Sequence, residues 1–173
     1  MINCYKRSIV QPKSETIVIP GNGLGLASNI YQAEIASLCG KDYLLEVRQK
    51  SAEARKKSKI GFCFSTNSYR LSRRGIKKIY HAIIQEHPGG LSSIYYVNQT
   101  IRLALSDIIK DGYSSVSICS FESGETNIGK HSVAISLLSA AKVYSKQLQI
   151  NFCDQDEEFL AIIKALSNAK CSK

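Results

Sequence analysis

The sequence has no run of about 18 consecutive apolar residues, the length that a membrane-spanning helix requires. Its first seven residues, Met-Ile-Asn-Cys-Tyr-Lys-Arg, also lack the apolar core of a secretory signal peptide. Hydrophobic residues make up 44% and charged residues 21% of the 173 positions, which is ordinary for a soluble globular protein. We therefore expect an intracellular protein, cytoplasmic or nuclear, with no membrane partner.

No Cys-x-x-Cys pair occurs among the six cysteines, and the three histidines are not spaced to complete a zinc site with them. Scattered cysteines in apolar runs are typical of small buried residues in a reducing compartment. The sequence therefore predicts no metal site, no cofactor and no cysteine nucleophile.

Acidic residues are almost missing from one part of the chain. Between Arg48 and Lys78 there are eleven Lys and Arg residues against Glu53 alone, a net charge of 11 − 1 = +10, whereas the remainder carries 12 − 13 = −1. Such a segment attracts polyanions, nucleic acid among them, although a solvated basic face that keeps the protein soluble gives the same pattern. The predicted polyanion-binding residues are Arg55, Lys56, Lys57, Lys59, Arg70, Arg73 and Arg74.

Short apolar runs alternate with amphipathic stretches along the chain, and no repeat or linker interrupts them. Strands are expected at 2–9, 15–20, 60–65, 76–84, 116–121 and 148–153. Helices are expected at 28–39, from 41 toward 55, from 92 to 110, at 130–147 and around 159–166. This alternation predicts one α/β domain over 1–173, a mixed sheet with helices on both faces in three layers, and a frayed tail from 168.

Two polar, glycine-containing loops directly follow predicted strands, at 21–25 and at 122–129. A strand, loop and helix in this order point backbone N–H groups at an anion, and both loops would lie beyond the carboxyl ends of the strands. A tight turn between a strand and a helix that binds no ligand would show the same sequence pattern. A dinucleotide fingerprint is not supported, because its third glycine is replaced by Leu26.

Taken in order, these stretches resemble the macro domain family of ADP-ribose-binding modules. Residues 17–22 (Ile-Val-Ile-Pro-Gly-Asn) are similar to the family's strand and Asn-Ala-Ala-Asn loop, and Ile79-Tyr80-His81 is similar to its Val-Ile-His strand. Residues 116–127 resemble the strand and phosphate loop, and residues 150–154 resemble the last strand. The resemblance covers most of the chain and implies a three-layer α/β/α macro-domain-like mixed sheet.

The chain departs from the family pattern at several positions that carry its chemistry. Ser8 and Ile9 stand where adenine-binding members have the Asp-Ile of Gly-Asp-Ile, and Cys153, next to Phe152, stands where an aromatic often stacks on adenine. Only the second Asn of Asn-Ala-Ala-Asn survives, as Asn22. Residues 28–31 replace the glycine run of hydrolytic members, and Gln32 is the nearest counterpart of their acidic or histidine helper.

The resemblance implies a binding module for ADP-ribose, free or protein-linked, or a related nucleotide diphosphate, and the departures favour a non-catalytic one. We expect the diphosphate between residues 23–28 and 123–128, bound mainly by backbone N–H groups. The predicted ligand contacts are Ser8, Ile9, Asn22, Gly23, Gly25, Ser28, Ser123, Gly124, Glu125, Thr126, Asn127, Ile128, Phe152 and Cys153. Two alternatives are a nucleic-acid or polyanion binder that uses residues 48–78, and an ADP-ribosyl or ADP-ribose-phosphate hydrolase.

Overall fold

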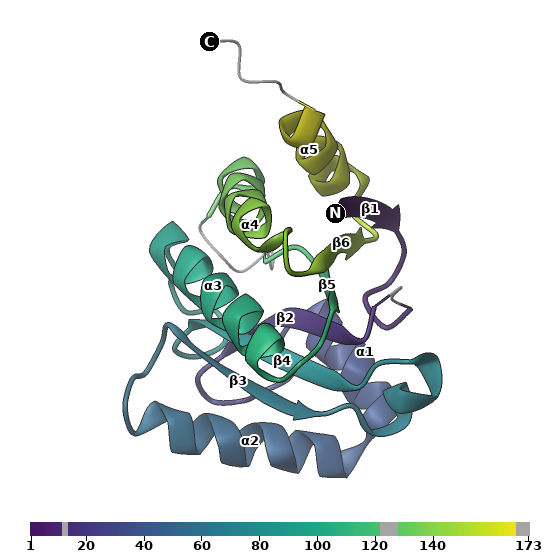
Figure 1. Ribbon diagram of the computed structural model, residues 1–173. Coiled ribbons are helices and arrows are strands. Elements are labelled where there is room, and N and C mark those ends of the chain that lie inside the picture. The colour runs from purple at the N-terminus through teal and green to yellow at the C-terminus, as the bar shows by residue number, and fades with distance from the viewer. Residues whose placement is uncertain (12–13, 122–127, 169–173) are drawn as a thin grey trace.

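A mixed sheet forms the centre of the molecule in the computed structural model, which describes residues 1–11, 14–121 and 128–168 (Figure 1). Within these residues the strands are β1 (Ile2–Lys6), β2 (Thr16–Asn22), β3 (Phe62–Asn67), β4 (Lys78–Gln85), β5 (Ser115–Ile118) and β6 (Gln149–Asp154). They lie in the order β1-β6-β5-β2-β4-β3, and all neighbours are parallel except the antiparallel pair β3 and β4. The carboxyl ends of five strands therefore meet at one edge.

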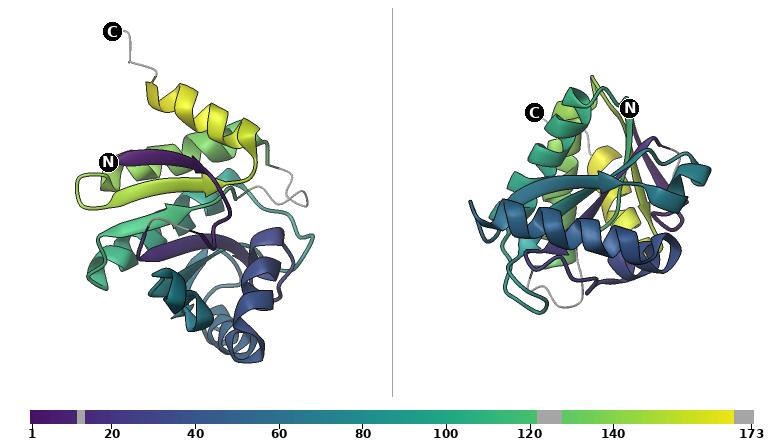
Figure 2. Two further views of the ribbon diagram at one scale, coloured as in Figure 1. Left: turned by 90° about the vertical axis from the view of Figure 1, so that its right-hand side faces the viewer. Right: turned by 90° about the horizontal axis from the view of Figure 1, so that it is seen from below.

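Helices cover both faces of this sheet (Figures 1 and 2). They are α1 (Ile30–Cys39), α2 (Lys41–Arg55), the 3-10 helix η1 (Tyr69–Arg74), α3 (Ile94–Lys110), α4 (Lys130–Tyr144) and α5 (Glu157–Asn168). Buried residues of α3, α4 and α5 form one core cluster with one face of the sheet, and those of α1, α2 and η1 form a second cluster with the other face. The predicted three-layer α/β/α fold is confirmed.

Strand β2 shows why the sheet is buried on both faces. Ile17 and Ile19 belong to the core cluster under α1 and α2, whereas Val18 between them belongs to the cluster under α3 and α4. All three side chains are fully buried, and each contributes roughly 1.5–3 kcal/mol by leaving water. A continuous apolar run is what a central parallel strand requires.

Local signals explain where α1 begins and ends. Asn29 caps its first turn, because the Asn29 side chain accepts a hydrogen bond of 2.9 Å from the Gln32 backbone. Gly40 then adopts φ 79°, in the left-handed region that favours glycine, and its N–H donates to Ala36 O at 2.9 Å. The expected break at Gly40 is therefore confirmed, and α2 begins one residue later.

Several predicted boundaries differ from the structure. The first strand, predicted at 2–9, ends at Lys6, and the helix predicted at 130–147 ends at Tyr144. The basic stretch between β3 and β4 was predicted as a loop, but residues 69–74 form η1, which turns the buried Leu71 into the core. The strand predicted at 116–121 leaves the ladder after Ile118. Two residues further on, the Ser120 N–H donates to the carboxylate of Asp154 at 2.7 Å instead of to a neighbouring strand.

None of the helices in the described part of the chain is both long and apolar enough to cross a membrane.

A column of rings runs through the second core cluster and contains a fully buried histidine. The ring of His81 lies parallel to that of Phe64 at 4.7 Å and is 5.9 Å from that of Tyr43. Its Nε2 lies 3.0 Å from Thr66 Oγ1, and its Nδ1 has no partner among the described residues. Burial lowers the pKa of His81 from its usual 6.5 to about 3, so the folded protein holds it neutral.

This buried histidine predicts a stability that falls with acidification. Between pH 6.5 and 3 the unfolded chain binds a proton at His81 that the folded protein does not. The contribution of His81 to the free energy of unfolding is therefore fully present above pH 6.5 and is lost progressively below it. The free energy of unfolding should fall by about 1.4 kcal/mol per pH unit from this group. Urea denaturation between pH 6.5 and 5 measures this slope.

His81→Gln should flatten the slope, whereas His87→Gln, at an exposed position, should leave it unchanged. Equal slopes in the parent and in His81→Gln would contradict the assignment.

Candidate ligand-binding site

A pocket of about 290 Å³ opens at the carboxyl ends of β1 and β6, beside α1. It is lined by Ser8, Ile9, Ile30, Tyr31, Glu34, Asp154 and Gln155. Ile9 and Tyr31 are buried and supply apolar walls, whereas Ile30 is 73% exposed at the rim. This position, beyond the ends of parallel strands, is where ligands bind in sheets of this kind.

Ser8 and Glu34 form a polar pair in this pocket. The Ser8 hydroxyl donates to Glu34 Oε2 at 2.6 Å and accepts from the Val10 N–H at 3.2 Å. The hydroxyl is therefore fixed in direction and holds the carboxylate of Glu34 against the pocket wall. Ser8 was predicted as a ligand contact and Glu34 was not, although Glu34 follows Tyr31 by three positions on α1 and thus shares its face.

Asp154, a second carboxylate of the pocket, is fully engaged by the protein itself. Its Oδ2 accepts from Tyr31 Oη and from the Ser120 N–H, both at 2.7 Å, and its Oδ1 accepts from the Asp156 N–H at 2.9 Å. Burial, with the nearby Asp154 charge adding to it, raises the pKa of Tyr31, so its hydroxyl stays a donor. Asp154 therefore joins α1, β5 and β6, and Glu34 is the carboxylate with capacity left for a ligand.

The two predicted ligand contacts at the end of β6 do not line the pocket. Phe152 and Cys153 are fully buried; Phe152 packs on Phe159, and the Cys153 thiol lies 3.5 Å from Ser117 Oγ. Neither lines the pocket, which is lined instead by the next two residues, Asp154 and the exposed Gln155. As a correction to the expected geometry, the aromatic side chain at this strand end faces the core under α5.

Asn22, at the end of β2, holds the first glycine-containing loop in shape. Its buried amide donates to Leu26 O and Ser28 Oγ, both at 2.9 Å, and accepts from the backbone N–H groups of Leu24 and Leu26 at 3.2 and 3.3 Å. Gln32, buried at 2% exposure, accepts from the Ser28 N–H and from the Asn29 side chain. The Asn22 amide and the amide oxygen of Gln32 are therefore used within the protein.

The backbone donors of this loop are also largely used. The Gly23 N–H donates to Gln85 O at 2.9 Å, the Gly25 N–H to Asn22 O at 3.0 Å, and the Ser28 N–H to Leu26 O at 3.0 Å. The expected diphosphate contact with these three N–H groups is not available in this arrangement, because each already donates to a backbone oxygen of the loop or of β4.

Packing against the protein accounts for the two glycines. A Cβ on Gly23 would lie 2.6 Å from Lys59 O and 3.0 Å from Glu86 O. Gly25 adopts φ 64°, and a Cβ there would lie 3.1 Å from the Cα of Arg48 on α2. The glycines therefore permit the loop to approach α2 and the end of β4 closely. We had expected them to permit the close approach of a ligand instead.

Only Ile128 and Gly129 of the second loop lie within the described residues. The predicted contacts Ser123, Gly124, Glu125, Thr126 and Asn127 lie outside the described residues. Ile128 is partly buried against the first core cluster. Gly129 is the N-cap residue of α4, and no side chain among the described residues caps the first N–H groups of this helix.

Comparison with known proteins places this fold. A family model, "Macro domain", matches residues 18–137. The chain belongs to the macro domain family. No curated protein matches the sequence significantly.

Solved macro domain structures share the fold at low sequence identity. The macrodomain of Mycobacterium tuberculosis DarG is 16% identical with a TM-score of 0.77, and the match covers 90% of this chain and 99% of that one. A variant Oceanobacillus iheyensis macrodomain with ADPR is 15% identical with a TM-score of 0.77, covering 95% and 88%. The same macrodomain with ADP is 16% identical with a TM-score of 0.75, covering 91% and 85%.

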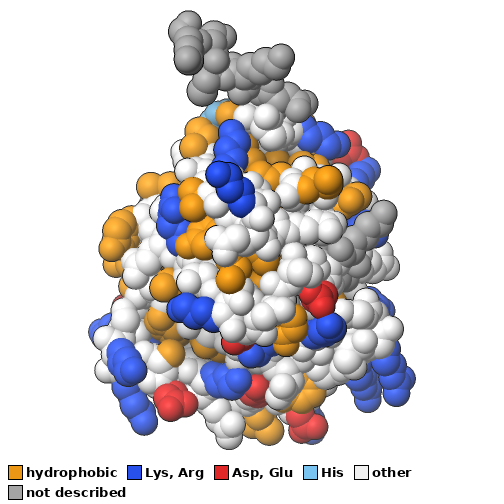
Figure 3. All heavy atoms as spheres, in the orientation of Figure 1, with side chains coloured by type: hydrophobic (Ala, Val, Ile, Leu, Met, Phe, Trp, Pro, Cys, Tyr) orange, Lys and Arg blue, Asp and Glu red, His pale blue; other side chains and the backbone are white. Residues whose placement is uncertain are grey.

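The basic segment of this macro domain is only partly neutralised. Arg55 and Lys59 share Glu86 at 3.2 and 3.3 Å, and Arg74 donates to Val10 O at 3.2 Å. Three further lysines of the segment are paired, Lys50 with Glu46, Lys77 with Glu15 and Lys78 with Asp111. The remaining predicted polyanion-binding residues are exposed and form no ion pair with any described residue: Lys56, Lys57, Arg70 and Arg73. Figure 3 shows Lys and Arg side chains over the lower part of the molecule, where α2 and β3 lie, with acidic side chains interspersed. No cluster of His, Cys, Asp and Glu suited to a metal ion occurs among the described residues.

The packing of the first loop predicts that its glycines matter for stability. Gly23→Ala should lower the free energy of unfolding by about 1–3 kcal/mol, the usual cost of overpacking, because its Cβ would meet backbone oxygens that cannot easily move. Gly129→Ala is the matched control, since no heavy atom of the residues that the structure describes lies within 4 Å of its Cβ position. Denaturant unfolding of both variants measures the difference, and equal stabilities would contradict the packing role.

Proposed function

We propose that this macro domain binds ADP-ribose or a related nucleoside diphosphate, free or attached to a protein, with its base in the Ser8–Glu34 pocket. Membership of the family and the macrodomain structures that hold ADPR or ADP support the ligand class. The observation that carries the proposal is the hydrogen bond of 2.6 Å from Ser8 to Glu34, which orients a carboxylate in an apolar pocket at the strand ends.

Together, Ser8 and Glu34 supply the oriented carboxylate that a single aspartate at position 8 would supply. The Glu34 carboxylate can accept a hydrogen bond from the exocyclic amino group of adenine, while Ile9 and Tyr31 enclose the ring. Ser8 contributes by holding the carboxylate. The diphosphate would then have to find its donors at the start of α4 and in residues 123–127, since the donors of the first loop are occupied.

Substitution of the pair tests the base pocket. Glu34→Gln should weaken ADP-ribose binding by about 1.5–3 kcal/mol, roughly 10- to 150-fold in Kd, because a charge-assisted hydrogen bond is lost. Ser8→Ala should cost less, about 0.5–1.5 kcal/mol, since the carboxylate remains but is no longer held. Calorimetry of each variant gives the two values.

An inosine analogue of ADP-ribose sharpens this experiment. It carries a carbonyl in place of the amino group, so it should bind the parent weakly, and the preference for adenine should disappear in Glu34→Gln, whose amide can donate or accept. Glu53→Gln removes the same charge from an exposed position on α2 and should leave binding unchanged. Equal affinity of the parent for the adenine and inosine ligands would contradict the role of Glu34.

We further infer that the protein does not hydrolyse ADP-ribosyl linkages at a useful rate. Hydrolysis needs a water held and polarised next to the ribose, and the two amides expected to help, Asn22 and Gln32, are buried in hydrogen bonds within the loop. Mass spectrometry of an ADP-ribosylated protein incubated with purified protein should show no loss of the modification. Release that scales with protein concentration and is lost in Glu34→Gln would contradict this inference.

A second candidate function is the binding of a polyanion to the basic segment. Lys56, Lys57, Arg70 and Arg73 are exposed cations without an ion pair among the described residues, which distinguishes them from the partly neutralised Arg55 and Lys59. Replacing Arg70, Arg73 and Arg74 with Ala together should flatten the dependence of polyanion affinity on salt, because fewer counterions are released. An unchanged slope would remove these three arginines from the binding surface.

A further inference from the structure

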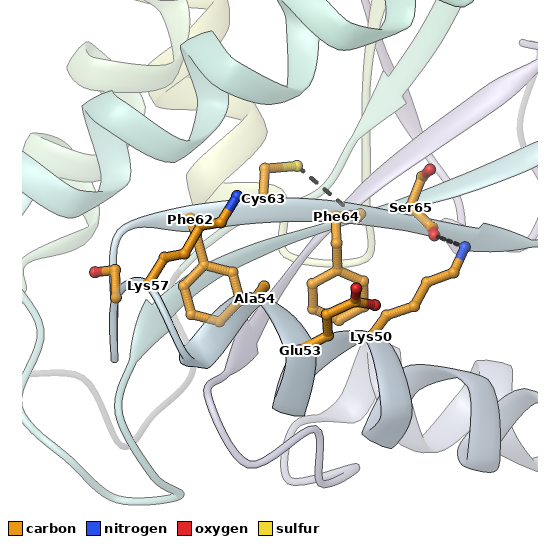
Figure 4. A pocket seen from close by; sticks show the side chains of 9 residues that line it. Lys50, Glu53, Ala54, Lys57, Phe62, Cys63, Phe64 and Ser65 are labelled. Atoms are coloured by element: carbon orange, nitrogen blue, oxygen red, sulfur yellow. Dashed lines mark hydrogen bonds between the residues drawn. The ribbon is translucent and has the colours of Figure 1, made fainter.

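A groove of about 530 Å³ lies between α2 and the edge strand β3 (Figure 4). In Figure 4 the rings of Phe62 and Phe64 point from β3 toward α2, and Lys57 and Lys50 stand near the two ends of the groove. The base pocket lies by β1, at the opposite edge of the sheet. The groove is thus a separate surface.

Two aromatic rings line the groove in an arrangement suited to stacking. Phe62 and Phe64 alternate along β3 and therefore share one face, and their rings are 6.2 Å apart at an interplanar angle of 28°. Phe64 is supported from behind by the parallel ring of His81 at 4.7 Å. Both phenylalanines are only partly buried, so the rings stay accessible although they are held in place.

Two lysines line the groove beside the rings. Lys50 lies on α2, and Lys57 lies in the turn that follows the end of α2 at Arg55. Lys50 is paired with Glu46 at 2.9 Å and donates to Ser65 O at 2.6 Å, whereas Lys57 and its neighbour Lys56 are exposed without an ion pair among the described residues. Glu53 is the one carboxylate that lines the groove.

We propose that this groove binds single-stranded nucleic acid, with bases stacked on Phe62 and Phe64 and phosphates contacted by Lys57 and the adjacent end of α2. Accessible aromatic rings beside a basic surface form the arrangement by which proteins hold single strands without reading their sequence. Lys56 and Lys57 are exposed and form no ion pair with a described residue, so they present positive charge to a polyanion beside the groove.

An extended peptide added to the β3 edge fits these observations less well. Lys50 already donates to one carbonyl of that edge, Ser65 O, and α2 runs beside it. The charged Lys50 side chain, which comes from α2, therefore covers part of this edge and hinders strand addition.

Fluorescence anisotropy tests the proposal with a labelled oligouridylate of about twelve nucleotides, within the range of roughly 4–16 nucleotides per site. Oligodeoxythymidylate of equal length compares DNA with RNA.

Phe62→Leu should weaken binding about 5- to 100-fold, the effect of losing one base–aromatic stack, and Phe62→Tyr should restore it. Lys57→Ala should lower the slope of log K against log salt by about 0.7, the value for one phosphate on a single strand. Glu53→Gln should strengthen binding.

Matched controls separate this groove from general effects of charge or folding. Tyr144→Leu removes a partly buried ring, and Lys146→Ala removes an exposed lysine, both at the end of α4; neither should change affinity or salt slope. ADP-ribose binding by Phe62→Leu should equal that of the parent, which shows that the variant is folded.

Absence of oligonucleotide binding at low salt would overturn the proposal. So would equal losses in Lys57→Ala and Lys146→Ala, or binding of an acidic peptide that is tighter than that of oligouridylate and is lost in Phe62→Leu.

Discussion

The buried carboxylate of Asp154 is the interaction on which the geometry of the base pocket depends. Removing a carboxylate from water is costly unless hydrogen bonds replace the water, and here Tyr31, Ser120 and Asp156 supply three donors. These donors come from α1, from the segment after β5 and from the turn after β6. One buried charge therefore fixes α1 against two strand ends, and this fixes the distance from Ser8, after β1, to Glu34 on α1.

The sequence predicted the architecture well because its signals are local. The apolar run of 17–19, the spacing of Val97, Ile101 and Leu105, and the break at Gly40 each have one low-energy backbone solution. Boundaries were less certain where tertiary contacts decide them. Residues 119–121 remain buried like a strand, yet they leave the ladder because Ser120 donates to Asp154.

The candidate site was predicted only in part, for a physical reason. A glycine at a strand end looks the same in the sequence whether the space left by its missing side chain is filled by a phosphate or by another part of the backbone. At Gly23 that space faces the backbone oxygens of Lys59 and Glu86. Glu34 was missed because its role exists only where α1 meets the segment after β1, 26 positions away in sequence. Pairings of this kind depend on the fold, not on local spacing.

The two proposed surfaces follow from the sheet order. The base pocket depends on the strands at the β1–β6 edge, and the groove depends on the β3 edge, with β5, β2 and β4 between them. Substitutions that share no contacts add nearly independently, so a change in one surface leaves the other as an internal measure of folding. Because Phe62 and Phe64 lie on β3 and the pocket lies beside β1 and β6, a single strand in the groove would not compete with a nucleotide in the pocket.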